Sequence, residues 1–222
     1  MKNVLVLGAT GRTGNFIIKE LDTLHTIQIT VGIRTLEDFT RIPKTSKSLA
    51  VSVLDINDKV SLMKALINVD IVVNALRMRN DAPSVLESTA LVELDKRLRG
   101  ATKKTGTPLI ISVGGAGSLN YPDKTKFWQN TLFPKKTFPR GKAQARLREY
   151  LEALPDTSSW SYLIPPPIYD FDGLRTGNYR RVTPSADERF FLNKSISYQD
   201  FAIAVRDSVS EEWTGTHLVG NI

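Results

Sequence analysis

Short apolar runs alternate along this chain with longer segments in which apolar residues recur every three or four positions. A short run is typical of a strand buried on both faces, and the recurring spacing is typical of an amphipathic helix. The runs cover residues 4–7, 27–33, 49–53, 70–75, 109–113, 160–164 and 216–219, and the helical segments cover about 14–24, 57–67, 83–103, 143–154 and 201–209. The alternation predicts one doubly wound α/β domain over residues 1–222, with a mostly parallel sheet, helices on both faces and a small C-terminal substrate region.

A glycine-rich turn separates the first strand from the first helix: Gly8-Ala-Thr-Gly11-Arg-Thr-Gly14. Gly8 lets the chain leave the strand in a tight turn, Gly11 keeps a Cβ away from a pyrophosphate, and Gly14 lets the helix pack closely on its strand. The helix N-terminus adds unpaired N–H groups and a partial positive charge. We therefore predict a dinucleotide phosphate site, although three glycines could also mark a plain strand–helix junction. The other turn residues complete the predicted contacts: Thr10, Arg12 and Thr13.

The second apolar run ends at Arg34, about 20 residues beyond the glycines, where a dinucleotide fold meets the adenosine ribose. An acid at this point accepts a hydrogen bond from the 2′-hydroxyl of NAD, whereas an arginine suits the 2′-phosphate of NADP. Arg12 could approach the same phosphate from the other side. We therefore expect NADP(H) in preference to NAD(H), with a solvated Arg34 as the alternative.

The glycine motif resembles the opening of the atypical and extended short-chain dehydrogenase/reductases. Within them it is most similar to the small NmrA-like, NAD(P)H-binding branch that includes flavin and biliverdin reductases. The run Gly114-Gly-Ala-Gly-Ser118 also resembles this branch. The resemblance implies that Asp55 and Ile56 lie beside the adenine, although Asp55 could equally be a plain loop acid. It also implies cofactor contacts at three further strand ends: Asn74, Ala75 and Leu76; Ser112, Val113 and Gly114; Pro165 and Pro166.

Typical members of this family carry a Tyr-x-x-x-Lys pattern, in which the tyrosine is the general acid and the lysine holds the nicotinamide ribose. None of the six tyrosines here has a lysine four residues on. The best match is Phe138-Pro-Arg-Gly-Lys142, and phenylalanine cannot donate a proton. Ser112, as a donor to a substrate carbonyl, and Lys142, as a ribose ligand, are the candidate catalytic residues. Lys142 could instead be a solvated helix lysine.

Two segments, about 120–140 and 165–195, are expected to form the substrate region. The first is rich in proline, lysine and aromatic residues and is too long for a plain connection, which predicts a lid or substrate wall. Packing of its aromatic side chains against the sheet is the alternative. The resemblance adds three candidate substrate contacts: Ser118 after the fifth apolar run, and Arg175 and Tyr179 in the loop after the sixth.

Composition narrows the chemistry further. The absence of cysteine excludes disulfides, thiolate catalysis and cysteine metal sites, and neither histidine has partners at metal spacing, so we expect no metal. The net charge of +7 is spread along the chain, which suits a phosphorylated cofactor or anionic substrate rather than nucleic acid. No apolar run approaches the about 18 residues of a membrane span, and a strand follows Met1 directly, so we expect a cytoplasmic protein with no signal peptide.

These features favour an NADPH-dependent reductase of the atypical short-chain type. Its acceptor would be a flat conjugated molecule, such as a flavin, quinone or tetrapyrrole, because the missing tyrosine disfavours alcohol and ketone chemistry. A non-catalytic, NADP(H)-sensing regulatory protein is the alternative that the NmrA resemblance allows, and a sugar-nucleotide epimerase or dehydratase is the third. A homodimer or a regulatory protein partner also stays open.

Overall fold

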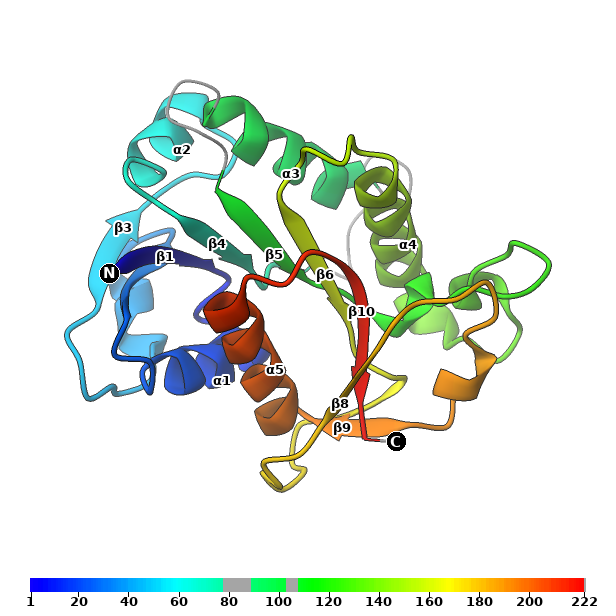
Figure 1. The fold of residues 1–222 in the computed structure, drawn as a ribbon. Coiled ribbons are helices and arrows are strands. Elements are labelled where there is room, and N and C mark those ends of the chain that lie inside the picture. The colour runs from blue at the N-terminus through cyan, green and yellow to red at the C-terminus, as the bar shows by residue number, and fades with distance from the viewer. Residues whose placement is uncertain (78–88, 103–107, 222) are drawn as a thin grey trace.

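The computed structural model describes residues 1–77, 89–102 and 108–221. Within them, eight strands form one sheet in the order β3-β2-β1-β4-β5-β6-β10-β8 (Figure 1). All neighbouring strands are parallel except β10 and β8, which are antiparallel. The strands are β1 Lys2–Leu7, β2 Ile27–Ile33, β3 Ala50–Val53, β4 Ile71–Asn74, β5 Leu109–Val113, β6 Trp160–Ile164, β8 Arg180–Val182 and β10 Gly215–Gly220. The first six follow the order 3-2-1-4-5-6 of a Rossmann-type fold, which confirms the predicted fold class.

Helices cover both faces of the sheet (Figure 1). Helices α1 (Arg12–Leu21) and α5 (Tyr198–Glu211) lie on one face, and α2 (Lys59–Ala65), α3 (Ala90–Ala101) and α4 (Phe138–Glu152) lie on the other. Alternate residues of β1 supply the two cores: Val4 and Val6 pack toward α1 and α5, whereas Leu5 and Leu7 pack toward α2 and α3. A separate pair of short parallel strands, β7 (Ile168–Asp170) and β9 (Ser195–Ser197), lies beyond the carboxyl end of β6.

Local signals account for two of the helix starts. The Asp58 carboxylate accepts hydrogen bonds from the backbone N–H groups of Val60 and Ser61, and α2 begins directly after Asp58, at Lys59. The Ser197 hydroxyl accepts a bond from the backbone N–H of Asp200 in the first turn of α5. Such caps satisfy N–H groups that the helix itself leaves unpaired.

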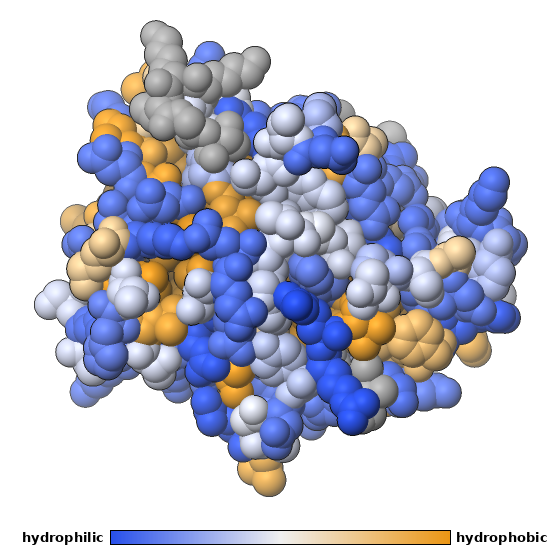
Figure 2. Space-filling model, in the orientation of Figure 1, coloured by the Kyte–Doolittle hydropathy of each residue, from blue (hydrophilic) through white to orange (hydrophobic). Residues whose placement is uncertain are grey.

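Some predicted boundaries and burials differ from the structure. Helix α4 starts five residues earlier than expected, at Phe138, and the expected segment 83–103 is described only as α3, because residues 83–88 and 103 lie outside the described part. The helical spacing of Val60, Met63, Leu66 and Ile67 predicts that all four are in the core. Three of them are not: Val60, Met63 and Ile67 are 57%, 38% and 60% exposed, and apolar side chains lie at the surface over α2 (Figure 2). Helix α2 buries only the side that carries Leu62, which is 0% exposed.

The aromatic residues of the segment 120–140 pack into the core beside α4 and β6. Phe127 and Phe133 are buried against α4 and β6, with their rings 5.1 Å apart in an edge-to-face contact. Tyr121, Trp128 and Phe138 pack around them, partly buried. This arrangement favours the alternative of aromatic packing over a free lid.

A buried ion pair joins helix α4 to the chain that follows β8. The Arg148 guanidinium, 1% exposed, donates to both carboxylate oxygens of Glu188 at 2.7 and 2.9 Å, and Glu188 is fully buried. Arg148 also donates to the carbonyl of Ser118, and Glu188 accepts from the backbone N–H of Asn120. One pair of charges therefore fixes the chain after β5 and the chain before β9 to α4.

Across residues 1–77, 89–102 and 108–221, no helix is both long and apolar enough to span a bilayer. Localisation in the cytoplasm stays a prediction.

Candidate functional site

The glycine turn has the geometry that its sequence predicts. Gly8 has a φ of +79°, and its carbonyl accepts a hydrogen bond from the N–H of Gly11 at 3.0 Å, which closes the turn. A Cβ on Gly8 would lie 2.7 Å from the backbone of Ala75, and a Cβ on Gly14 would lie 2.2 Å from the Gly8 carbonyl oxygen. Glycine at both positions therefore lets the turn contact the end of β4 and lets α1 pack against the turn.

The N-terminus of α1 faces this turn without a side-chain cap. Gly11 is the N-cap residue, it makes no side-chain hydrogen bond, and the first turn of α1 carries no acidic residue. The N–H groups of Arg12 and Thr13 therefore lack the side-chain acceptor that many helices place here. A Cβ on Gly11 would meet only the Gly8 carbonyl at 3.2 Å, so the approach to these N–H groups stays open. A pyrophosphate fits this cradle by charge and by space.

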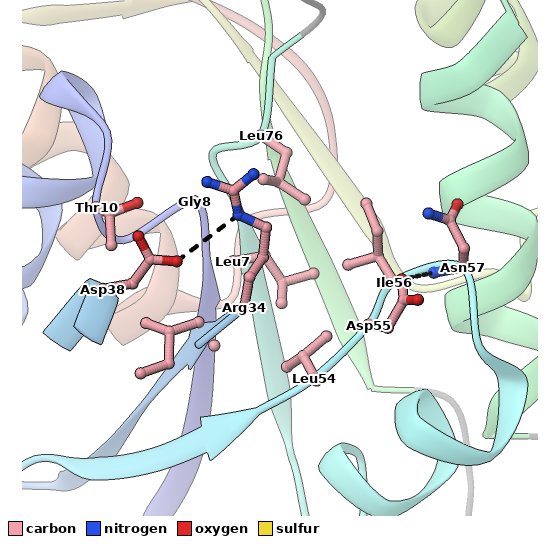
Figure 3. A pocket seen from close by; sticks show the side chains of 12 residues that line it. Leu7, Gly8, Thr10, Arg34, Asp38, Leu54, Asp55, Ile56, Asn57 and Leu76 are labelled. Carbon is pink, nitrogen blue, oxygen red and sulfur yellow. Dashed lines mark hydrogen bonds and ion pairs between the residues drawn. The ribbon is translucent and has the colours of Figure 1, made fainter. Parts of the chain in front are cut away.

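A pocket of about 530 Å³ lies beside the turn (Figure 3). Its walls come from the carboxyl ends of β1, β2 and β3 and from the connection after β4, the edge at which open α/β sheets bind ligands. Its lining residues are Leu7, Gly8, Thr10, Gly32, Ile33, Arg34, Asp38, Leu54, Asp55, Ile56, Asn57 and Leu76. An apolar floor with a polar rim suits a flat base with its ribose, so the residues present fit the adenosine half of a dinucleotide.

Two charged side chains of the lining, Arg34 and Asp38, lie at the mouth of this pocket, and Arg41 contacts Asp38 beside it. The Asp38 carboxylate, 14% exposed, has the guanidinium of Arg41 at 3.0 Å and that of Arg34 at 3.7 Å, each beside a different oxygen (Figure 3 shows the Arg34 pair). The Arg34 side chain is 81% exposed. The arginine side of this pair is solvated and 3.7 Å exceeds the length of a hydrogen bond, so Arg34 can leave Asp38 for a stronger anion at little cost.

Sequence reasoning missed Arg41, which contacts two residues of the pocket lining, Asp38 and Thr10, and Arg12 is placed differently from the prediction. Arg41 ends the 3₁₀ helix Leu36–Arg41 and also donates to the Thr10 carbonyl at 3.4 Å, so it connects this helix to the glycine turn. The Arg12 guanidinium lies 4.8 Å from the ring centre of Phe171 and lines a second, smaller hollow. The available signal for Arg41 was an arginine three residues after Asp38, close to the end of β2.

The residues after β3 and β4 continue the site. Asp55 and Ile56 line the pocket, and the Asp55 carboxylate accepts a bond from the backbone N–H of Asn57 at 2.8 Å. The Asn74 amide oxygen accepts from the N–H of Leu76 at 3.2 Å, and the N–H of Ala75 donates to the Leu7 carbonyl. These bonds hold the turn after β4 directly beside the glycine turn, where Leu76 lines the pocket.

Ser112 occupies the carboxyl end of β5. It pairs in register with Asn74 on one side and Tyr162 on the other, and Val113 follows it on the opposite face. Ser112 is 1% exposed, and its hydroxyl has no hydrogen-bond partner within residues 1–77, 89–102 and 108–221. It shares its face of the sheet with Tyr162, which packs against α4, so Ser112 and the helix that carries Lys142 lie on the same side.

The glycines after β5 serve protein packing. A Cβ on Gly117 would lie 2.5 Å from the Cα of Gly141 in α4, and a Cβ on Gly114 would lie 2.7 Å from the Tyr162 ring. The Tyr162 hydroxyl donates to the side-chain oxygen of Gln144 at 2.6 Å, and burial raises the pKa of Tyr162, so it stays protonated. Ser118 is fully buried and donates to the Gly115 carbonyl at 2.7 Å. Ser118 therefore has no exposed surface with which it could make the predicted contact with a substrate.

Lys142 and Phe138 lie in the first turns of α4. Phe138 packs on Trp128 and Phe133, with ring centres 6.4 and 5.9 Å away, and therefore belongs to the aromatic cluster. The Lys142 ammonium lies 5.8 Å from the Trp128 ring centre, and the residue is half-buried. The helix therefore holds a cation near the β5 end and no proton donor four residues before it.

The remaining predicted residues divide into two groups. Pro165 and Pro166 are buried at the carboxyl end of β6, the same edge of the sheet as the glycine turn. Arg175 instead pairs with Glu20 of α1 at 2.8 Å, and the Tyr179 hydroxyl donates to Asp207 of α5 at 2.7 Å. Both side chains thus have partners on the α1–α5 face, and neither lines the pocket of Figure 3, so we do not carry them forward as substrate contacts.

A Rossmann-type sheet with this turn and pocket defines a dinucleotide-binding protein. A family model described as NAD(P)H-binding matches residues 8–212, and the chain belongs to this family. The match confirms the predicted relation to an NAD(P)H-binding family, while membership of the short-chain dehydrogenase/reductases and of their NmrA-like branch stays a prediction. The protein YwnB of Bacillus subtilis (strain 168) is 28% identical over 206 residues, which are 92% of this chain and 90% of YwnB.

Three solved structures show the same fold. A "putative NADH-flavin reductase" from Streptococcus pneumoniae TIGR4 matches with a TM-score of 0.79 at 21% identity, over 100% of both chains. A "putative epimerase" from Bacteroides thetaiotaomicron matches with 0.79 at 22% identity, over 100% of this chain and 97% of the other. A short-chain dehydrogenase/reductase from Veillonella parvula DSM 2008, in complex with NADP, matches with 0.65 at 19% identity, over 99% and 94%. At these identities the likeness shows the fold alone.

Proposed function

We propose that the protein is an NADPH-dependent reductase that transfers hydride to a flat conjugated acceptor such as a flavin, quinone or tetrapyrrole. The adenosine half of the cofactor would occupy the pocket of Figure 3, and the N–H groups at the start of α1 would bind the diphosphate. The nicotinamide, which supplies the hydride when bound, belongs at the ends of β5 and β6. There Ser112 and Lys142 are the polar groups that would hold and orient it.

The charges at the pocket mouth support NADPH over NADH. Arg34 is exposed and weakly paired, and Arg41 lies on the other side of Asp38, so two guanidinium groups are within reach of a 2′-phosphate. The structural neighbour from Veillonella parvula, which was solved with NADP, gives indirect support.

The observation that carries the choice of reaction is Phe138. It stands four residues before Lys142, where a tyrosine acid would be expected, and it is packed into an aromatic cluster. Reduction of a simple carbonyl needs a proton donor at the oxygen, and sugar-nucleotide epimerisation uses the same tyrosine as a base. A conjugated acceptor delocalises the charge that hydride transfer creates and needs less help. The flavin reductase name of one structural neighbour agrees with this choice.

The test measures NADPH oxidation with each member of a panel of flavins, quinones and biliverdin. The reaction is monitored by the loss of the absorbance of the reduced nicotinamide. We expect turnover with at least one acceptor. Binding of NADPH without turnover on any of them would overturn the reductase and leave the cofactor site standing.

Two replacements of Gly11 give a matched control. Aspartate and asparagine both suit an N-cap and should keep α1 folded, since Gly11 has an ordinary extended conformation with φ of −83°. Only aspartate places a negative charge where the diphosphate binds. We expect Gly11→Asp to abolish turnover and Gly11→Asn to retain more of it. Equal loss in both would mean that bulk, and not charge, controls this site.

A non-catalytic NADP(H) sensor is the second candidate. One observation favours it: Ser118, Arg175 and Tyr179, the polar residues expected to contact a substrate, are all engaged with other parts of the protein. Such a protein would bind NADPH and NADP⁺ with different affinities and turn over neither. The same acceptor panel, run beside titrations with both forms of the cofactor, separates the two functions.

A further inference from the structure

Asp38 is the acidic side chain at the pocket mouth that the reductase proposal does not use. It lies in the wall of the pocket, is largely buried, and faces the same opening as Thr10 and Arg34 (Figure 3). Glu37, its neighbour in the chain, is exposed and does not line the pocket. Of the two adjacent acids, Asp38 is the one that lines the pocket and can meet a molecule that enters.

The arrangement of charges around Asp38 is suited to two different ligands. One carboxylate oxygen is 3.0 Å from Arg41, and the other is 3.7 Å from Arg34, beyond the usual length of a hydrogen bond. The second oxygen can therefore accept a hydrogen bond from a ribose hydroxyl without breaking a strong contact. A phosphate, in contrast, would bring two negative charges to the two arginines and would be repelled by the carboxylate between them.

We propose that Asp38 is the residue that sets cofactor specificity in this pocket. It accepts a hydrogen bond from the ribose 2′-hydroxyl of NADH and, by its charge, limits the advantage that Arg34 and Arg41 give to NADPH. The protein therefore binds both cofactors, with a preference for NADPH that is smaller than the two arginines alone would produce. This inference rests on the proposed function, because it assumes that the adenosine ribose lies at this pocket mouth.

Replacement of Asp38 should move the two affinities in opposite directions. In Asp38→Ala, NADPH no longer meets a like charge, and its Kd should fall about three- to tenfold, whereas NADH loses its acceptor, and its Kd should rise by a similar factor. Asp38→Asn removes the charge and keeps an oxygen acceptor. It should tighten NADPH equally and weaken NADH less.

The experiment is isothermal titration calorimetry of the wild-type protein, Asp38→Ala, Asp38→Asn and Glu37→Ala with NADPH and with NADH. Glu37→Ala removes the same charge one residue away and should leave both Kd values within about twofold, because solvent screens an exposed charge. Affinities that move together in Asp38→Ala, or that match those of Glu37→Ala, would overturn the role of Asp38.

The outcome for the wild-type protein separates this inference from the function on which it rests. Binding of NADPH together with unchanged affinities in the Asp38 variants would refute the specificity role alone. Failure of the wild-type protein to bind either cofactor would refute the proposed function and the inference with it. The two arginines give a second readout: if Asp38 acts as proposed, Asp38→Ala should increase the salt dependence of NADPH binding and leave that of NADH binding unchanged.

Discussion

At one side of the sheet, the ends of β1, β2 and β3 surround an open pocket whose charged groups lie near solvent and pair weakly. At the other side, the chain after β5 and β6 is covered by aromatic residues and fixed by a fully buried ion pair. The first region is built from four short pieces of chain, 7–10, 32–38, 54–57 and Leu76, each next to a strand end. The second region joins residues 30 to 68 positions apart in the chain, such as Arg148 and Ser118, or Glu188 and Asn120.

The difference shows where ligand chemistry and where stability reside in this fold. The pocket keeps one exposed, weakly paired cation, Arg34, that an anionic ligand can recruit. The aromatic region pairs its polar groups with one another, and under the proposed function it would border the nicotinamide. Replacements in the second region should therefore change stability, and replacements at the pocket should change binding.

The largest expected effect is in the second region. Arg148→Met leaves Glu188 buried without a cation, which should lower the free energy of unfolding by about 3–5 kcal/mol in urea titrations. Arg189→Met breaks a neighbouring pair with Asp187 at the surface and should cause no measurable change. Similar unfolding midpoints for these two variants would remove the contrast between the regions. Part of the lost stability should return in the double variant Arg148→Met, Glu188→Leu.

The next effect tests a tightly packed point of the first region, the contact between α1 and the glycine turn. Gly14→Ala would place a Cβ 2.2 Å from the Gly8 carbonyl oxygen, and we expect a loss of about 1–3 kcal/mol because backbone must move. Gly100→Ala, in α3, meets no atom within 4 Å and should instead stabilise by about 0.5–1 kcal/mol through helix propensity. Thermal unfolding of both variants measures these changes in the free energy of unfolding. A stable Gly14→Ala protein would mean that the glycine turn tolerates a looser contact with α1.

A smaller effect, on binding alone, distinguishes the two arginines that the sequence offered for the 2′-phosphate. Arg34→Gln should weaken NADPH binding by about tenfold and leave NADH binding unchanged, because the lost hydrogen bonds are charge-assisted. Arg12→Gln should leave the ratio of the two affinities near the wild-type value, since Arg12 lies over Phe171. Loss of selectivity in Arg12→Gln would show that this side chain moves to the phosphate when the cofactor binds.

The smallest effect concerns a half-buried histidine in β10, His217. Burial, and then the nearby Arg181, lower the pKa of His217 from its ordinary value of 6.5, so the folded protein binds fewer protons at this site than the unfolded chain does. Its contribution to stability is complete above about pH 6.5 and is lost as pH falls through the lowered pKa. Unfolding of wild type and His217→Gln between about pH 8 and pH 5 should show a shallower decline in the variant. Parallel curves would exclude the histidine as the cause.

The sequence predicted those features that depend on neighbours in the chain. The apolar runs became strands within one or two residues, and for the central strands β4 and β5 the reason is that a strand buried on both faces needs apolar side chains at nearly every position. The positive φ of Gly8 and the close contact of Gly14 follow from the spacing of the glycines. Leu62 and Leu66 of α2 are buried, but Val60, Met63 and Ile67 are not, since the helix lies near an edge of the sheet and only one of its sides meets the core.

The features that the sequence did not predict are set by partners far along the chain. By residue type and position in the sequence, Ser118 and Arg175 resemble ligand-binding residues. In the structure Ser118 is buried beside Tyr162 and α4, and Arg175 pairs with Glu20, 155 positions away. Arg41 carries no motif, and its place at the pocket follows from the 3₁₀ helix that returns it to Thr10. The packing role of Gly114 and Gly117 was likewise hidden, because their neighbours lie on β6 and α4.

The central claim is that the adenosine half of NADPH binds in the pocket between β1, β2 and β3. Adenosine 2′,5′-bisphosphate carries that half alone, including the 2′-phosphate. The most direct measurement is a competition titration, in which this fragment displaces NADPH from the wild-type protein and does so less well from Arg34→Gln. The account predicts full displacement, with the fragment weakened by the replacement in proportion to NADPH. NADPH binding that the fragment does not affect would contradict it and place the cofactor elsewhere.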